Sequence, residues 1–173
     1  MNAISLKKRI DLLLYFFIFG LAISGLTAIP LQWELGILNR FLGEGSWMQS
    51  LWPDMADWIT FVWQGLNDAY SNYPFLQYGT DWLAFAHIML AIAFIGVLND
   101  PIRNIWLIEF GMIACVLVIP TALIFGTLRG IPLFWQIIDC SFGVIGILPL
   151  WLCRKYIRSL QIAGQPAAAA KAA

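Results

Sequence analysis

The stretch from Phe110 to Leu128, FGMIACVLVIPTALIFGTL, contains no formally charged residue. A helix of about 20 apolar residues crosses the hydrocarbon core of a bilayer, which is about 30 Å thick. Together with the apolar residues Ile105–Ile108, which precede it across Glu109, this stretch predicts a membrane-spanning helix near 104–126. The fold class then depends on how many other stretches share this character.

Three further stretches do. Leu12–Trp33 carries no formal charge, and Trp82–Asn99 is interrupted only by His87. A third stretch, Gly130–Cys153, is apolar except for one acid at its centre. Each is long enough to cross a bilayer as a helix. The four predicted spans are therefore 10–30, 81–98, 104–126 and 131–153.

The composition agrees with a membrane protein. Of the 173 residues, 61% are hydrophobic and 12% are charged, whereas soluble domains have about 45–50% apolar and about 25% charged residues. A soluble domain of this size cannot bury so much apolar surface in one core. Ten basic and ten acidic residues give a net charge of zero, which offers no patch for a polyanion. Soluble globular, disordered and nucleic-acid-binding classes are excluded, and no nucleic acid is expected as a partner.

The basic residues that flank the spans predict the orientation, because Lys and Arg accumulate on the cytoplasmic side. With the N-terminus in the cytoplasm, the inner segments carry eight basic residues and the outer segments carry two. We therefore expect both termini in the cytoplasm and a first span that is retained, since its apolar stretch is longer than that of a signal peptide. The inner set is Lys7, Lys8, Arg9, Arg103, Arg154, Lys155, Arg158 and Lys171, and the outer set is Arg40 and Arg129.

Residues 31–80 form the one long segment outside the predicted spans. Between Pro53 and Tyr70 apolar residues recur at helical spacing, which predicts an amphipathic helix. One interpretation is a surface helix on the outer leaflet, and the other is a docking face for a partner protein or a lid over a lipid-like substrate. Lipid-surface helices usually carry Lys or Arg on the polar face, so an acidic polar face favours protein contact. The apolar residues are Met55, Trp58, Ile59, Val62, Leu66 and Tyr70, and the polar ones are Asp54, Asp57, Gln64 and Asp68.

Ionisable residues inside membrane spans are costly, so each is a candidate site. On helices that enter from the outer side, His87 lies about 9 Å below Asp81, and Asp139 lies about 12 Å below the start of its helix. These depths predict that His87 and Asp139 meet, with Asp81 and Arg129 at the rim. The pair is interpreted either as a hydrogen bond that joins two helices or as a proton-responsive or ligand-binding pair.

The third ionisable residue in the spans is Glu109, which lies in the inner half of the bilayer. It enters from the inner side, about 9 Å from Arg103. We expect its carboxylate to pair with Arg103, with Arg154 or with the basic cluster at residues 7–9.

The residues for catalysis and cofactor binding are few. A b-type haem in a membrane commonly has two axial histidines, and this chain has one histidine. Haem within one chain would need His87 together with Met89, Met112 or another weak ligand. Haem shared with another subunit is a separate alternative, in which that subunit supplies the second ligand. The basic start followed by Ser24-Gly25 resembles the anchors of four-helix b-type cytochromes, but the ligands of that family are missing. No catalytic residue, metal site or cofactor is expected.

Several strings in the second half resemble a group of uncharacterised bacterial inner-membrane proteins. The resemblance covers about half of the chain and implies a bacterial inner (plasma) membrane without implying an activity. The strings are 78–87 (YGTDWLAFAH), 103–106 (RNIW), 129–132 (RGIP) and 139–143 (DCSFG).

The expected fold is all-α: a four-helix transmembrane bundle over residues 1–163, with an extracytoplasmic amphipathic helix between the first two spans and an Ala-rich tail at 164–173. The expected function is that of a non-enzymatic accessory subunit, or of a small-ligand binder that uses His87 and Asp139. Alternatives are a redox anchor that holds haem or quinone at a subunit interface, and a small proton- or ion-coupled transporter. Expected partners are the lipid bilayer, a protein at the outer helix and a second copy of the chain.

Overall fold

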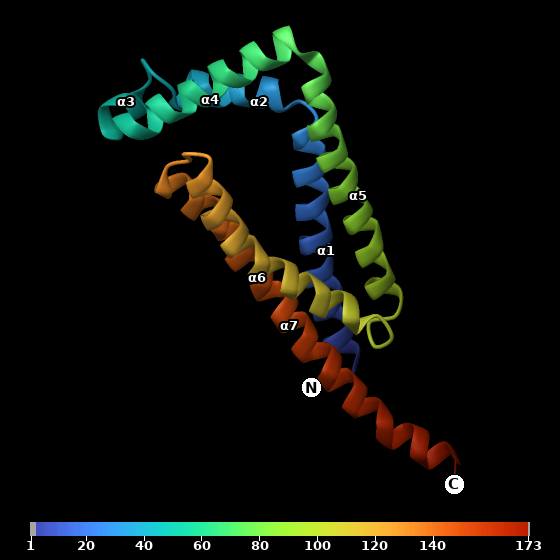
Figure 1. Cartoon of the computed structure of the whole chain (residues 1–173). Helices are drawn as coiled ribbons and strands as arrows, with labels where there is room; N and C mark the ends of the chain where they lie inside the picture. Colours follow the sequence, from blue (N-terminus) through green and yellow to red (C-terminus); the bar gives the residue numbers. More distant parts are fainter. Residues whose placement is uncertain (1–2, 173) are drawn as a thin grey trace. The chain divides into compact units, whose positions relative to one another are not determined.

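The structure, a computed structural model, describes residues 3–172 and the side chains of residues 3–163. Every regular element in this part of the chain is a helix (Figure 1). Four helices are long and apolar enough to cross a membrane, which confirms the all-α class and the four long apolar helices predicted. They are α1 (Ala3–Ala28), α5 (Gln77–Asn99), α6 (Ile105–Leu128) and α7 (Leu133–Ala172).

Three of these helices extend well beyond their predicted spans. Helix α1 begins at Ala3 rather than near residue 10. Helix α5 begins at Gln77 rather than near residue 81, because a short 3-10 turn at Pro74–Leu76 leads directly into it. Helix α7 continues well past residue 153, and its backbone includes residues 164–172 of the predicted tail. The basic residues after Cys153 are good helix formers, so they prolong the helix that the apolar stretch begins.

The segment between α1 and α5 contains more structure than the single helix predicted for it. Besides α4 (Pro53–Asn72), it contains α2 (Leu31–Leu42) and the short helix α3 (Trp47–Leu51). Only Ile29 and Pro30 separate α1 from α2. Helix α4 lies where the sequence predicts a helix. Helices α2 and α3 were not predicted, and the first residues of α2 belong to the charge-free stretch that predicts the first span.

The chain falls into two compact units, which are described separately. Unit 1 consists of Met1–Gly20 and Ala91–Ala173, and unit 2 consists of Leu21–Leu90. Unit 1 therefore holds α6, α7, most of α1 and the end of α5, while unit 2 holds α2, α3, α4 and the remaining parts of α1 and α5.

In unit 1, α6 and α7 lie side by side and antiparallel (Figure 1). A Cβ atom added to Gly143 would overlap the carbonyl oxygen of Cys115, and one added to Gly146 would lie 3.0 Å from the Cys115 Sγ. The two backbones therefore approach closely, as small residues allow between membrane helices. The buried apolar side chains of unit 1 include Leu6, Ile10, Leu14, Ala91, Phe94, Val97, Leu107, Ile108, Leu150, Cys153 and Ile157.

The turn between α6 and α7 is ordered by hydrogen bonds. Gly130 has a φ of +69°, a conformation that favours glycine, and the Ile131 N–H donates to the Gly126 carbonyl over 2.9 Å. The Gln136 side chain is buried and donates from Nε2 to the Ile131 carbonyl over 2.7 Å. A buried amide thus satisfies a carbonyl that the turn leaves without a helical partner.

In unit 2, α2 and α4 form a second antiparallel pair (Figure 1). Gln32 Nε2 donates to Asn67 Oδ1 over 2.8 Å, and the Thr60 hydroxyl donates to Asn39 Oδ1 over 2.7 Å. Between these two contacts, the indole nitrogen of Trp63 lies over Gly36. Because the three contacts are spaced by about one helical turn, they align the two helices in one register.

The side chains of α4 divide as the sequence predicts. Its apolar set is buried or half-buried, and its polar set is exposed. Helix α2 packs against α4 through the contacts just described, so the buried side of α4 is covered by protein. The residues compared are Met55, Trp58, Ile59, Val62, Leu66 and Tyr70 in the apolar set, and Asp54, Asp57, Gln64 and Asp68 in the polar set.

Candidate functional site

His87 lies at a contact between two helices of unit 2. Its ring nitrogen Nδ1 is 2.8 Å from the Leu83 carbonyl oxygen of the same helix. A carbonyl only accepts hydrogen bonds, so this contact places the proton on Nδ1 and leaves Nε2 for another partner. From α1, Gly25 meets the histidine so closely that an added Cβ would be 2.9 Å from the His87 Cβ. His87 therefore packs against α1 at a position that requires glycine.

Asp139 lies on α7 in unit 1 and is half-buried. Among the side chains that the structure describes, residues 3–163, none makes a hydrogen bond or an ion pair with its carboxylate. Because His87 belongs to unit 2 and Asp139 to unit 1, their contact stays a prediction.

The two residues expected at the rim are both exposed. Asp81 lies near the start of α5 in unit 2, and Arg129 follows the end of α6 in unit 1. Their role beside His87 and Asp139 also stays a prediction.

The structure brings Glu109 together with two cations of α7. Arg154 Nε is 2.8 Å from Glu109 Oε1, and one terminal nitrogen of Arg158 is 3.6 Å from the same oxygen. Of the predicted partners, Arg154 is therefore confirmed. The backbone N–H of Arg103, in the turn before α6, donates to the Asp100 carboxylate.

Further cations gather near this ion pair. Lys7 Nζ donates to Asp11 Oδ1 over 2.6 Å and to the Leu98 carbonyl over 2.7 Å. Arg9 donates to the Tyr156 hydroxyl over 3.4 Å. These contacts join the first turns of α1 to the last turn of α5 and to the basic part of α7. We call this region the basic end of unit 1: Lys7, Lys8, Arg9, Arg154, Lys155 and Arg158.

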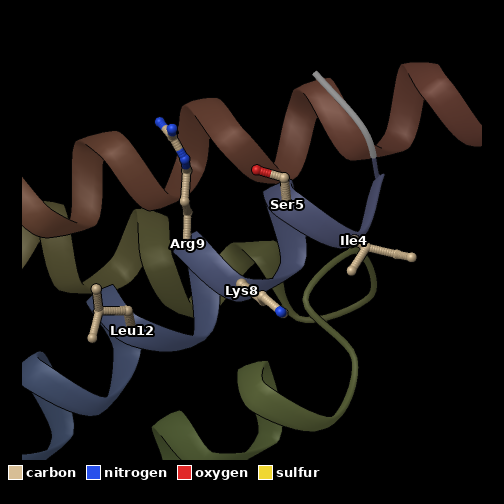
Figure 2. A pocket seen from close by; sticks show the side chains of 5 residues that line it. All are labelled: Ile4, Ser5, Lys8, Arg9 and Leu12. Atoms are coloured by element: carbon tan, nitrogen blue, oxygen red, sulfur yellow. The ribbon is translucent and has the colours of Figure 1, made fainter.

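Two surface grooves open at the basic end of unit 1. The first has a volume of about 440 Å³ and follows one side of α1 (Figure 2). The second, of about 450 Å³, lies between α1 and the end of α5. The first is lined by Ile4, Ser5, Lys8, Arg9 and Leu12, and the second by Lys7, Asp11, Tyr15, Ile18, Ile95, Leu98 and Asn99.

Among the described residues, no three His, Cys, Asp or Glu side chains lie close enough together to hold a metal ion. Comparisons with protein families, with curated proteins and with solved structures found no match to this chain. A functional proposal must therefore rest on the geometry of the chain itself.

Several polar residues that organise the structure are not ionisable and were missed among the candidates. Gln136 lies inside an apolar stretch, where a single amide stands out as clearly as an acid does. Asn39 and Thr60 had no such signal, because both lie outside the predicted spans, where a polar residue is ordinary. Their importance depends on which helices pair, and that pairing joins residues far apart in the chain.

Proposed function

We propose that the chain is a multi-pass integral membrane protein of the bacterial inner membrane, with α1, α5, α6 and α7 as its spans and both termini in the cytoplasm. In that membrane it acts by binding, as an accessory subunit or as a receptor for a small ligand at the region of His87 and Asp139. Four long apolar helices are what such a protein requires.

One observation supports this orientation above all. Every residue of the basic end of unit 1 belongs to the set that the charge rule assigns to the cytoplasm. Lys7 contacts the end of α5, Arg9 contacts Tyr156, and Arg154 contacts the start of α6 through Glu109. Segments that are far apart in sequence thus bring their cations together, as they would where four spans end on one side of a bilayer.

Reporter fusions test this topology. A periplasmic reporter inserted at Gly45, in the exposed turn before α3, should be active, and the same reporter at the C-terminus should be inactive. A cytoplasmic reporter should give the reverse pattern. If both positions report the same side, the assignment of four spans is wrong.

The outer segment is proposed to rest on the outer leaflet through α2 rather than through α4. The apolar side of α4 is already covered by α2, so the acidic residues of α4 can face water. Helix α2 presents Trp33, Ile37 and Phe41 on one exposed flank. The short link from α1 keeps α2 at the membrane surface, where Trp is favoured. The occupant of this flank is therefore the lipid interface.

A fluorophore that responds to polarity tests this placement. In a chain whose native cysteines are replaced by serine, the label on Ile37→Cys should be quenched by spin-labelled lipids, and the label on Gln64→Cys should not. If neither position is quenched in a correctly folded chain, the exposed flank of α2 does not contact lipid and is covered by a partner protein. Cross-linking between copies at position 37 would assign it to a second copy.

The proximity of His87 and Asp139, which a shared ligand site requires, is tested by placing cysteines at both positions. Oxidant should cross-link them, and Asp139→Asn should weaken thermal stability less than Asp139→Leu, because an amide still hydrogen-bonds to the imidazole. Failure of the cross-link in a folded protein would remove this pair as the ligand site.

The geometry of His87 favours one second candidate, a redox anchor. Histidines that bind metals usually donate the other ring N–H to a carbonyl or a carboxylate, and the contact with Leu83 has this form. His87 Nε2 would then bind the iron of a haem shared with another subunit. A purified complex with a Soret band that disappears in His87→Ala would support this candidate, and a colourless complex would reject it.

A further inference from the structure

The cations at the basic end of unit 1 are unevenly neutralised. Lys7 faces the carboxylate of Asp11, and Arg154 and Arg158 share that of Glu109. Lys8 and Arg9 are both exposed, and no carboxylate within the described part of the chain lies within ion-pair distance of either. Lys155 likewise has no carboxylate partner in the described part of the chain, and its ammonium lies over the Trp151 ring. Of the three cations without a carboxylate, Lys8 and Arg9 line the same groove on α1.

The lining of this groove is polar in the middle and apolar at both ends. Ser5 lies one turn of α1 before Lys8 and Arg9, and in Figure 2 the Arg9 side chain points toward α7 while the Lys8 side chain points away from it. Ile4 and Leu12, which bound the groove, are 66% and 71% exposed. Such a surface combines donors for an anion with apolar contacts for a chain attached to it.

Arg9 is positioned without being neutralised. Its guanidinium carbon lies 5.8 Å from the centre of the Tyr156 ring, and one of its nitrogens donates to the Tyr156 hydroxyl. A phenol ring is uncharged, so it orients the guanidinium by cation–π attraction and leaves its charge available. The remaining N–H groups keep the planar arrangement that binds a phosphate through two hydrogen bonds.

We propose that the groove formed by Ile4, Ser5, Lys8, Arg9 and Leu12 binds the phosphate of an anionic phospholipid. Arg9 binds the phosphate, Lys8 adds positive charge beside it, and the apolar surface that begins at Leu12 contacts an acyl chain. This assignment rests on the proposed placement of α1 in the membrane, where basic side chains near the inner surface attract anionic lipids. The second groove is the internal comparison, because its Lys7 already has a carboxylate partner.

The test uses the full chain in nanodiscs of phosphatidylcholine that contain rising fractions of phosphatidylglycerol, with retained lipid counted by native mass spectrometry. Lys8→Gln/Arg9→Gln should lower the apparent affinity for phosphatidylglycerol about tenfold, or about 1.4 kcal/mol. The matched control Arg103→Gln/Lys155→Gln removes two charges from the same side of the protein. It should change the apparent affinity for phosphatidylglycerol less than about twofold.

Each other outcome has a definite meaning. An equal loss of phosphatidylglycerol affinity in both variants would show that the basic residues attract anionic lipid without a specific site, and would overturn the proposal. Competition by inorganic phosphate alone at similar affinity would identify a soluble phosphate as the ligand and overturn the lipid assignment. Incorporation of the chain into pure phosphatidylcholine nanodiscs tests the membrane proposal separately, since it does not depend on Lys8 or Arg9.

Discussion

The molecule contains two antiparallel helix pairs that are held together by different means. In unit 1, α6 and α7 meet through glycines: Gly143 lies against the Cys115 carbonyl, and a Cβ added to Gly111 would lie 2.9 Å from the Leu150 side chain. In unit 2, α2 and α4 meet through side-chain hydrogen bonds, such as that of Thr60 to Asn39. One pair depends on close backbones and the other on polar groups between the helices.

The difference fits two different solvents. Lipid tails are as apolar as leucine, so membrane helices gain little from burying apolar side chains and associate instead through the close packing that small residues allow. In water, burial of an apolar face drives association, and buried polar groups must find partners, which fixes the register. The contrast therefore agrees with the proposed membrane location of α6 and α7 and with the proposed water-facing location of α4.

The largest effect is expected from substitutions that disrupt the close contact of Gly143 with Cys115. Gly143→Leu should leave little folded protein, because backbone atoms of Cys115 cannot move aside, and Gly143→Ala should lower the stability by about 2–3 kcal/mol through overpacking. The control is Gly20→Ala, which meets no atom within 4 Å and should be neutral or stabilising. The measurement is the midpoint of thermal unfolding in a mild detergent.

A chain with Gly143→Leu that unfolds at the wild-type temperature would contradict the close contact of α6 and α7. The contrast between the two helix pairs would then lose its basis.

The next effect breaks the polar contact of unit 2. The buried hydroxyl of Thr60 donates to Asn39 and accepts from the backbone N–H of Glu44 over 2.8 Å. Thr60→Val keeps the shape and removes both bonds, which should cost about 2 kcal/mol because buried groups lose their partners. Faster hydrogen exchange should appear in residues 31–72 and not in α6 or α7.

The matched control is Thr121→Val. That hydroxyl donates to a carbonyl of its own helix and is exposed, so its loss should change the stability by less than about 0.5 kcal/mol. If Thr60→Val speeds hydrogen exchange equally in α2 and α6, the two units do not unfold separately.

The sequence predicts the long helices well, because each repeats a simple signal, an apolar stretch of sufficient length. It also predicts the two sides of α4, since apolar side chains at helical spacing must find cover. What covers them could not be predicted. Helix α2 begins inside the charge-free stretch that predicts the first span, and its partner α4 follows only after the intervening helix α3.

The candidate residues divide in a similar way. The partner of Glu109, Arg154, was among those predicted, because few cations in the sequence lie at the same depth as Glu109. The partners of Asn39 and Gln32 depend on the register of two helices, which no local pattern encodes. Gln136 was within reach of prediction, since an amide in an apolar stretch requires a hydrogen-bond partner.

The smallest expected effect concerns the ion pair of Glu109 with Arg154, which joins α6 to α7. The side chains are 43% and 30% exposed, so water screens the pair and a double-mutant cycle of Glu109→Gln and Arg154→Gln should give a coupling of about 0.5–1 kcal/mol. Added salt should weaken it. Lys155→Gln, whose ammonium lies over the Trp151 ring, is the control and should show no coupling to Glu109. A coupling above about 3 kcal/mol that salt does not change would place the pair in hydrocarbon rather than at the level where α6 and α7 leave it. The ion pair would then be a polar contact inside the hairpin of α6 and α7 that the glycines pack. The two helix pairs would still belong to different units, but lipid and water would no longer explain how their packing differs.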